Sequence, residues 1–262
     1  LLFHKSLKKT SPKVRKEGLI LGLLMAGGYI LQVYSINFTD VARAAFLTCI
    51  CLIGIPIFSF ILFKEVIKLH SLIGVILAVI GLYIFLDPNF AGINAGDILG
   101  LLSIPPWALY MIYLSVFTNG KEGPDVTNQY LYWQLIGVLP AALMTALIFE
   151  SGLIAPLHPD LGKGLTLSPK LVIGVVFNGV FASLATVYLQ TRCQRYTSAV
   201  QAMICFQVEP IVATIAALII LSESLNAHVV VGGIIILSAV VSSELGGILV
   251  RRNSSSEKKI DA

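Results

Sequence analysis

Long apolar runs separated by short polar connections dominate the chain. Eight of these runs are long enough for a helix that crosses a bilayer, which takes about 20 mostly apolar residues. They lack the alternation of apolar and polar residues that is typical of membrane β-barrel strands. The pattern therefore predicts an all-α polytopic membrane protein. The predicted spans are residues 18–36, 40–63, 69–87, 97–117, 127–149, 170–190, 197–221 and 227–250.

The connections predict an orientation. Loops on one side of the predicted membrane carry 15 of the 18 Lys and Arg residues, and such an excess marks the cytoplasmic side. Residues 1–17 are then a basic cytoplasmic loop, and residues 251–262 are a cytoplasmic tail that we expect to be disordered from Asn253 onward. The long connection at residues 151–169 is rich in Pro and Gly and is predicted to be a loop on the outer side.

Composition narrows the function classes. Hydrophobic residues make up 56% of the 262 residues, charged residues make up 12%, and mean hydropathy is +0.88. Soluble domains carry about 25% charged residues, so a soluble enzyme and a disordered chain are excluded. The net charge of +4 is small and its basic residues are clustered between spans, which excludes a nucleic-acid binder. The Cys and His spacings match no metal site, and no cofactor motif is present.

An internal repeat relates residues 38–86 to residues 196–244 at a constant offset of 158 positions. The charge pattern predicts that the first copy's proline-containing helix runs from outside to inside and the second copy's runs the other way. Similar segments in opposite orientations are typical of secondary transporters, whose substrate site lies between the repeats. The matched pairs include Phe38 and Tyr196, Thr39 and Thr197, Ala44 and Ala202, Glu65 and Glu223, and Gly74 and Gly232.

These segments resemble a known family. Residues 44–48 (AAFLT), followed by Ile55-Pro56 and Lys64-Glu65, resemble the first repeat of the EamA-type branch of the drug/metabolite transporter superfamily. Residues 207–213 (QVEPIVA), followed by Ser222-Glu223 and residues 232–237, resemble the second repeat. The resemblance covers essentially the whole chain.

The resemblance implies a ten-helix fold made of two inverted five-helix repeats. Residues 18–87 would then be the last three helices of the first repeat, and residues 97–250 would be all five of the second. We therefore expect that two N-terminal helices are missing, which agrees with a start at Leu1 rather than at a methionine.

Glu209 is a candidate proton-coupling residue. It lies in the middle of a predicted span, directly before Pro210, and ionisable groups inside a membrane are costly and commonly functional. The alternative is a neutral hydrogen-bond donor that stabilises a kinked helix. Pro210 and, in the first copy, Pro56 are the predicted helix kinks, although the two prolines are out of register by about one turn.

Arg43 has two interpretations as well. It could pair with Asp40 or reach the headgroups, or it could face the pathway and bind a substrate carboxylate. Gln201 is its counterpart in the second copy. A further set of aromatic and amide side chains is predicted to line a substrate pathway, since such a lining suits small organic solutes. These residues are Tyr29, Gln32, Trp107, Tyr110, Gln134, Asn178 and Gln190.

The sequence thus predicts a non-enzymatic secondary transporter in a bacterial inner membrane, as a monomer or a homodimer. The resemblance implies export or exchange of amino acids, related metabolites or drug-like compounds, with protons as a candidate coupling ion. No phosphate-binding loop of the GxxxxGK[ST] type is present to couple it to ATP. The alternatives are a membrane enzyme acting on lipid-linked substrates, and a passive channel or assembly partner.

Overall fold

The computed structural model describes residues 10–39, 41–64, 66–88, 92–121, 123–149, 169–212, 215 and 226–260. Within these ranges the ordered elements are helices, and no strand occurs. Four helical segments are long and apolar enough to cross a membrane, namely Pro12–Phe38, Arg43–Phe63, Leu69–Leu86 and Ala95–Thr118. The prediction of an all-α polytopic membrane protein is confirmed. That all eight runs cross the bilayer stays a prediction.

Within the described residues each predicted span is mainly helical, but several spans are divided into shorter helices. The continuous helices are α2 (Pro12–Phe38), α5 (Leu69–Leu86), α8 (Pro124–Phe149) and α13 (Ala227–Ile260). The broken spans are α3 (Val41–Cys49) with α4 (Cys51–Phe63), α6 (Ala95–Leu102) with α7 (Ile104–Thr118), and α9 (Pro169–Phe177) with the π-helix η1 (Asn178–Ala185) and α10 (Thr186–Cys193). The seventh span begins as α11 (Ala199–Phe206), and helix resumes at Glu209.

The C-terminal end differs from the prediction. Residues beyond Asn253 were expected to be disordered, but α13 continues through the polar segment to Ile260. This segment contains no Gly or Pro after Val250, and Glu, Lys and Arg are good helix formers, so the apolar part of α13 can propagate its helix into it. The predicted outer loop lies outside the described residues, apart from Pro169.

The chain forms two compact units, each of which is described by itself. The first consists of Leu1–Ile30 and Tyr113–Tyr196, and the second of Leu31–Ile112 and Thr197–Ala262. In the first unit, α2 and α8 cross where glycines meet. A Cβ at Gly22 would lie 2.2 Å from the carbonyl oxygen of Gln134, and one at Gly137 would lie 2.7 Å from that of Leu19. Only residues without a side chain allow two backbones this close.

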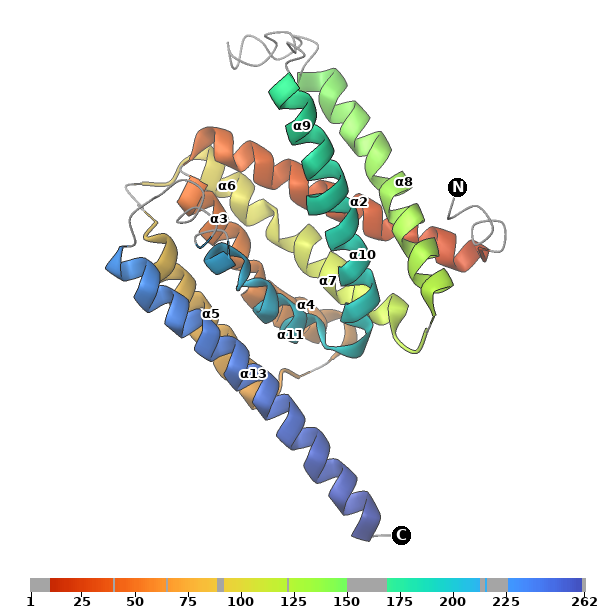
Figure 1. Cartoon of the computed structure of the whole chain (residues 1–262), viewed down its shortest axis with the longest axis vertical. Helices are drawn as coiled ribbons and strands as arrows, with labels where there is room; N and C mark the ends of the chain where they lie inside the picture. Colours follow the sequence, from red (N-terminus) through yellow and green to blue (C-terminus); the bar gives the residue numbers. More distant parts are fainter. Residues whose placement is uncertain are drawn as a thin grey trace. The chain divides into compact units, whose positions relative to one another are not determined.

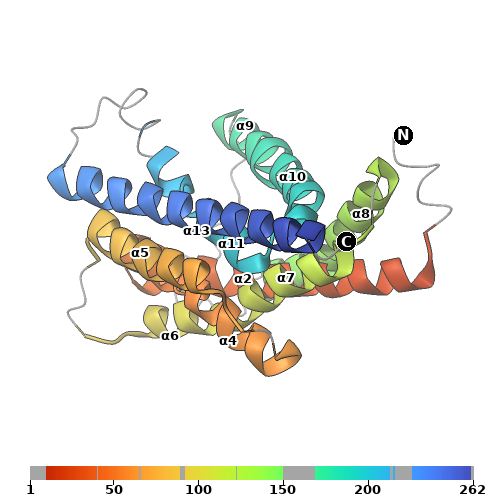
Figure 2. The same cartoon turned by 90° about the horizontal axis from the view of Figure 1, so that it is seen from below.

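In the second unit, α5 and α13 lie side by side along most of α5 (Figures 1 and 2). They run antiparallel, since Gly74 faces Ser243 whereas Gly81 faces Ile236. A Cβ at Gly81 would lie 2.9 Å from the backbone nitrogen of Ile236, and one at Gly232 would lie 2.5 Å from that of Phe85. Glycine therefore sets the separation of these two helices.

Contacts across the α5–α13 pair come in two equivalent sets. Gly74 approaches Ser243 and the Ala239 carbonyl oxygen, and Gly232 approaches Phe85 and the Gly81 carbonyl oxygen. The second set follows from the first when each residue is exchanged for its counterpart at the offset of 158. The hydrophobic clusters that flank the pair correspond in the same way, with Ile204 and Ala78 in one cluster and Phe46 and Ile236 in the other.

The offset also holds for the helix boundaries. The pairs of helix starts at Val41 and Ala199, Cys51 and Glu209, and Leu69 and Ala227 are each 158 residues apart. In the first copy the break falls at Ile50, six residues before Pro56, which lies inside α4. In the second copy Pro210 follows the break directly. A proline in the first turn of a helix removes no intrahelical hydrogen bond.

The close approach of α5 and α13 can be tested by substituting two adjacent glycines, Gly232 and Gly233. Gly232→Ala places a methyl group against the backbone of Phe85, and we expect it to destabilise the protein by about 1–3 kcal/mol, the usual cost of overpacking. At Gly233 a Cβ would lie 3.7 Å from the nearest atom, the Cε2 of Phe85. Gly233→Ala should therefore leave stability unchanged or raise it by up to about 1 kcal/mol through helix propensity. Thermal unfolding of both variants in detergent checks this, and equal shifts would contradict it.

Candidate functional site

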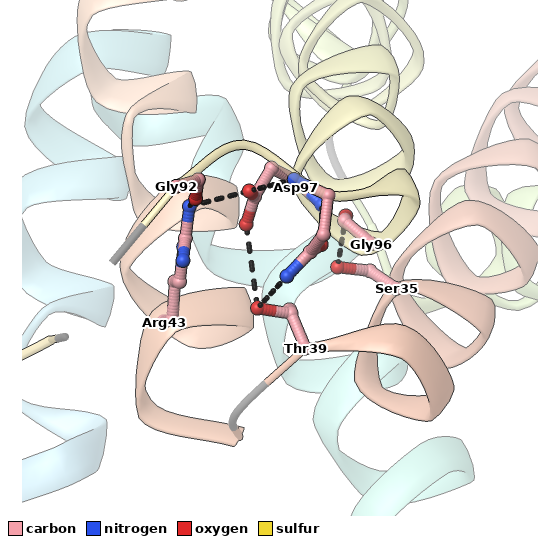
Figure 3. A network of polar contacts seen from close by, with 7 residues as sticks. Ser35, Thr39, Arg43, Gly92, Gly96 and Asp97 are labelled. Carbon is pink, nitrogen blue, oxygen red and sulfur yellow. Dashed lines mark hydrogen bonds and ion pairs between the residues drawn. The ribbon is translucent and has the colours of Figure 1, made fainter. Parts of the chain in front are cut away.

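A buried polar network in the second unit centres on Arg43 and Asp97 (Figure 3). One guanidinium nitrogen of Arg43, Nη2, donates to the Asp97 carboxylate and to the carbonyl oxygen of Gly92. The two charged side chains are only 7% and 5% exposed. Removing two charges from solvent is costly unless each is paired and hydrogen-bonded, and this network meets that condition for both.

Asp97 is held in place by the start of α6. The Asn94 side chain accepts a hydrogen bond from the Asp97 backbone N–H at 3.0 Å, and the Asn94 N–H donates to the Asp97 carboxylate at 2.7 Å. This is a capping box, in which the first and fourth residues satisfy each other's free N–H groups. The carboxylate also lies in the first turn of α6, where the helix dipole attracts a negative charge.

The end of α2 joins the same network. Thr39 donates to the Asp97 carboxylate at 3.3 Å, and the Asn94 amide donates to Thr39 at 3.2 Å. Ser35 donates to the carbonyl oxygen of Gly96 at 2.7 Å (Figure 3). A Cβ at Gly96 would lie 2.7 Å from the Ser35 carbonyl oxygen, so a larger residue would separate the helices. The end of α2, the start of α3 and the start of α6 are thus fixed to one another.

Sequence reasoning missed Asp97 as the partner of Arg43. Asp40, the suggested partner, lies outside the described residues, and the guanidinium lies on Asp97. A substrate carboxylate that bound Arg43 would have to displace Asp97 or share the guanidinium with it. The Asn94-x-x-Asp97 spacing ahead of an apolar run was the available signal, because it marks a capped helix start.

A second charged cluster lies in the first unit. Lys121 donates to the Glu17 carboxylate at 3.0 Å and to the Tyr130 hydroxyl, and this hydroxyl also bonds to Glu17. The Arg195 guanidinium bonds to the Lys121 carbonyl oxygen and to the Thr127 hydroxyl. The cluster connects α2, α8 and the turns that follow α7 and α10. Sequence reasoning treated its charges only as an orientation signal.

The predicted pathway residues divide between the two units. In the first unit, Gln134 is fully buried and donates to the Thr191 hydroxyl at 3.3 Å, and Gln190 donates to Gln194 at 3.2 Å. Tyr29 is 45% exposed, and Asn178 begins the π-helix η1. The Gln134 amide thus connects α8 to α10, and the Gln190 amide stabilises the end of α10.

In the second unit, Trp107 and Tyr110 form an edge-to-face pair with ring centroids 6.0 Å apart, and Tyr110 is fully buried. Gln201 accepts hydrogen bonds from Thr197 and Ser198 in the first turn of α11, and Gln32 is partly buried on α2. Arg43 and Gln201 therefore occupy equivalent positions with different partners. That all these residues line one pathway stays a prediction.

Each copy in the second unit has a short interruption in its proline-containing helix, at Ile50 in the first copy and at residues 207–208 in the second. Glu209 begins the helix that resumes after the break in the second copy, and its side chain is exposed. Backbone hydrogen bonds continue past both interruptions, from the Gly54 N–H to the Ile50 carbonyl oxygen and from the Val212 N–H to the Val208 carbonyl oxygen.

Comparison with known proteins agrees with this architecture. The model of the EamA-like transporter family matches residues 1–86 and 94–243. The chain belongs to the EamA-like transporter family. An uncharacterized transporter of Archaeoglobus fulgidus is 24% identical over 230 residues, a match that covers 86% of this chain and 68% of the relative. An uncharacterized transporter of Clostridium kluyveri is 26% identical over 233 residues, covering 86% of this chain and 67% of the relative.

A solved structure supports the fold of this EamA-like chain. One crystal structure aligns with this chain with a TM-score of 0.69 and 13% sequence identity. The alignment covers 92% of this chain and 78% of the other chain. At this identity the likeness concerns the fold alone. Family membership and apolar helices together make the chain a multi-pass membrane transporter.

The Arg43–Asp97 pair of this EamA-like protein can be tested by a double-mutant cycle. Arg43→Gln and Asp97→Asn each leave one buried charge without its partner, and we expect each to cost about 3–5 kcal/mol. Removing both charges should cost clearly less than the sum of the two single changes, because no charge is then left buried alone. Thermal unfolding of the four proteins measures the coupling. Additive losses would show that the pair contributes no interaction of its own.

Proposed function

We propose that this protein is a secondary transporter that exports or exchanges small organic metabolites, such as amino acids, by alternating access. The observation that carries this proposal is the double set of contacts between α5 and α13. Membership of the EamA-like family supports the general activity. The substrate class, the direction and the coupling belong to the proposal.

The contacts support an inverted repeat. A two-fold axis that crosses an antiparallel helix pair maps each helix onto the other with its direction reversed. Gly74–Ser243 and Gly232–Phe85 are such a mapped pair of contacts, and the helix starts follow the same offset. In transporters built this way, one repeat rocks against the other around a central site, which opens alternately to each side. A fixed channel has no need of this symmetry.

The helix interruption at residues 207–208, with Glu209 directly after it, is the proposed site of coupling. Discontinuous helices bind substrates and ions in many transporters because their free ends present N–H and C=O groups inside the membrane. Glu209 supplies a carboxylate at this place, and its position on the resumed helix exposes it to an exchangeable proton. The alternative role, a neutral hydrogen-bond donor that stabilises the kinked helix, predicts that Glu209→Gln leaves the coupling unchanged.

Chemical turnover distinguishes this proposal from the enzyme alternative, because a transporter returns its substrate unaltered. Among the described residues, no group of three or more His, Cys, Asp and Glu side chains forms a metal-type cluster.

We place the protein in a bacterial inner membrane with its C-terminus in the cytoplasm, as the loop charges predict. A monomer or a homodimer fits the proposal.

Counterflow in proteoliposomes tests transport and coupling together. The full-length protein is reconstituted and loaded with a panel of amino acids, and exchange is measured with and without a proton gradient. We expect saturable exchange in the wild type, stimulated by the gradient. Glu209→Gln should keep the exchange and lose the stimulation, because an amide cannot carry the proton.

Glu257→Gln, near the end of α13, makes the same chemical change as a control and should leave both activities unaltered. If Glu209→Gln behaves like the wild type, the coupling proposal fails while the transporter proposal stands. If no amino acid in the panel exchanges, the proposed substrate class is wrong. Non-saturable flux would favour a channel.

A further inference from the structure

An apolar groove lies between α4 and α5 in the second unit. It holds a volume of about 380 Å³ and is lined by side chains of both helices, among them Ile53, Pro56, Ile57, Phe60, Leu72 and Val75. Ile57 and Phe60 are each 52% exposed, so the groove opens on a surface of the second unit. An apolar surface of this kind is chemically suited to the acyl chains of a bilayer.

Two cations stand at one end of the groove. Lys64 ends α4 in a left-handed conformation with φ 57°, which turns the chain toward α5, and Lys68 directly precedes α5. The Lys64 ammonium lies 5.5 Å from the centre of the Phe60 ring, so it is held beside a residue that lines the groove. Both lysines are exposed, and neither forms an ion pair with any described residue.

The connection between the two lysines is suited to a membrane surface. Val66 is 78% exposed and Leu69 is 72% exposed, although both are large apolar residues. Apolar side chains beside exposed lysines are typical of segments that sit at the boundary between headgroups and acyl chains. The loop charges assign this end of α4 to the cytoplasmic side, where anionic lipids attract basic segments with about 1 kcal/mol per Lys or Arg.

The repeat shows that these cations are not a requirement of the fold. The positions equivalent to Lys64 and Lys68 in the second copy are Ser222 and Asn226, so the equivalent turn on the other side carries no positive charge. The cations are thus specific to the turn that is predicted to face the anionic leaflet. The positive charge at this end of the groove therefore complements the negative charge of an anionic lipid headgroup.

We propose that the α4–α5 groove binds an anionic phospholipid of the cytoplasmic leaflet. One acyl chain lies along Pro56 and Phe60 between the helices, and the phosphate is bound by the ammonium groups of Lys64 and Lys68. This inference is independent of the transported substrate, since it concerns a face of α4 and α5 that the proposed coupling site does not use.

Native mass spectrometry of the full-length protein tests the groove. The detergent-purified protein is titrated with phosphatidylglycerol and with phosphatidylcholine of the same acyl chains, and the affinity for the first bound lipid is compared. We expect the wild type to prefer phosphatidylglycerol. The double variant Lys64→Asn/Lys68→Gln should lose this preference, with about a fivefold weaker affinity for each lysine removed. Asn is chosen at position 64 because it tolerates a positive φ.

Two further variants make the result specific. Lys258→Asn/Lys259→Gln removes the same charge from the end of α13 and should keep the preference for phosphatidylglycerol. Ile57→Trp fills the groove and should weaken the binding of both lipids without altering their order. The proposal is overturned if the wild type binds the two lipids equally, if the control variant loses the preference as well, or if Ile57→Trp changes nothing. A dimer that excludes lipid and that Ile57→Trp dissociates would assign the groove to a second copy instead.

Discussion

The second unit depends on the close packing of α5 and α13, two helices that lie far apart in the sequence. Gly74, Gly81 and Gly232 let the backbones of α5 and α13 approach until a methyl group at any of them would meet an atom of the other helix at 3.0 Å or less. In a bilayer, apolar side chains gain little from leaving lipid for protein, so helices associate through close packing and backbone proximity. The clusters around Leu52 and Phe46 then assemble on both sides of this pair. The remaining helices of the unit are placed by these clusters and by the polar network at Arg43.

The sequence predicted the helices well because membrane helices must satisfy their backbone groups internally and must be apolar over a fixed length. The described part of each predicted span is mainly helical, and the offset of 158 reappears at three pairs of helix starts. The breaks could not be predicted in the same way. Pro56 lies inside a helix and the nearby break falls at Ile50, so the proline did not mark the break. The extension of α13 to Ile260 also escaped prediction, because polarity marks the end of a membrane span but not the end of a helix.

The candidate site was only partly predictable for a related reason. Arg43 was recognised as an ionisable residue within an apolar run, but its partner Asp97 is 54 residues away, and pairing over such a distance depends on tertiary structure. Glu17 and Lys121, 104 residues apart, escaped prediction in the same way. Gln134 and Gln190 were selected as polar lining, and the structure shows that their amides already make internal hydrogen bonds. A polar residue inside a membrane protein joins helices as readily as it binds a substrate, and the sequence alone does not distinguish these uses.

The two copies agree in their helices and differ in how their first helices begin. α11 is capped by its own Ser198, whose hydroxyl accepts from the Gln201 backbone N–H. At the equivalent start of α3, Thr39 bonds to Asp97 of α6, and Arg43 joins the same carboxylate. The described polar contacts at the start of the first copy therefore reach to α6, whereas those at the start of the second copy stay within its own first turn. The Arg43–Asp97 ion pair thus has no equivalent at Gln201, which accepts hydrogen bonds from its neighbours Thr197 and Ser198. The same helix position serves long-range tertiary packing in one copy and local helix capping in the other.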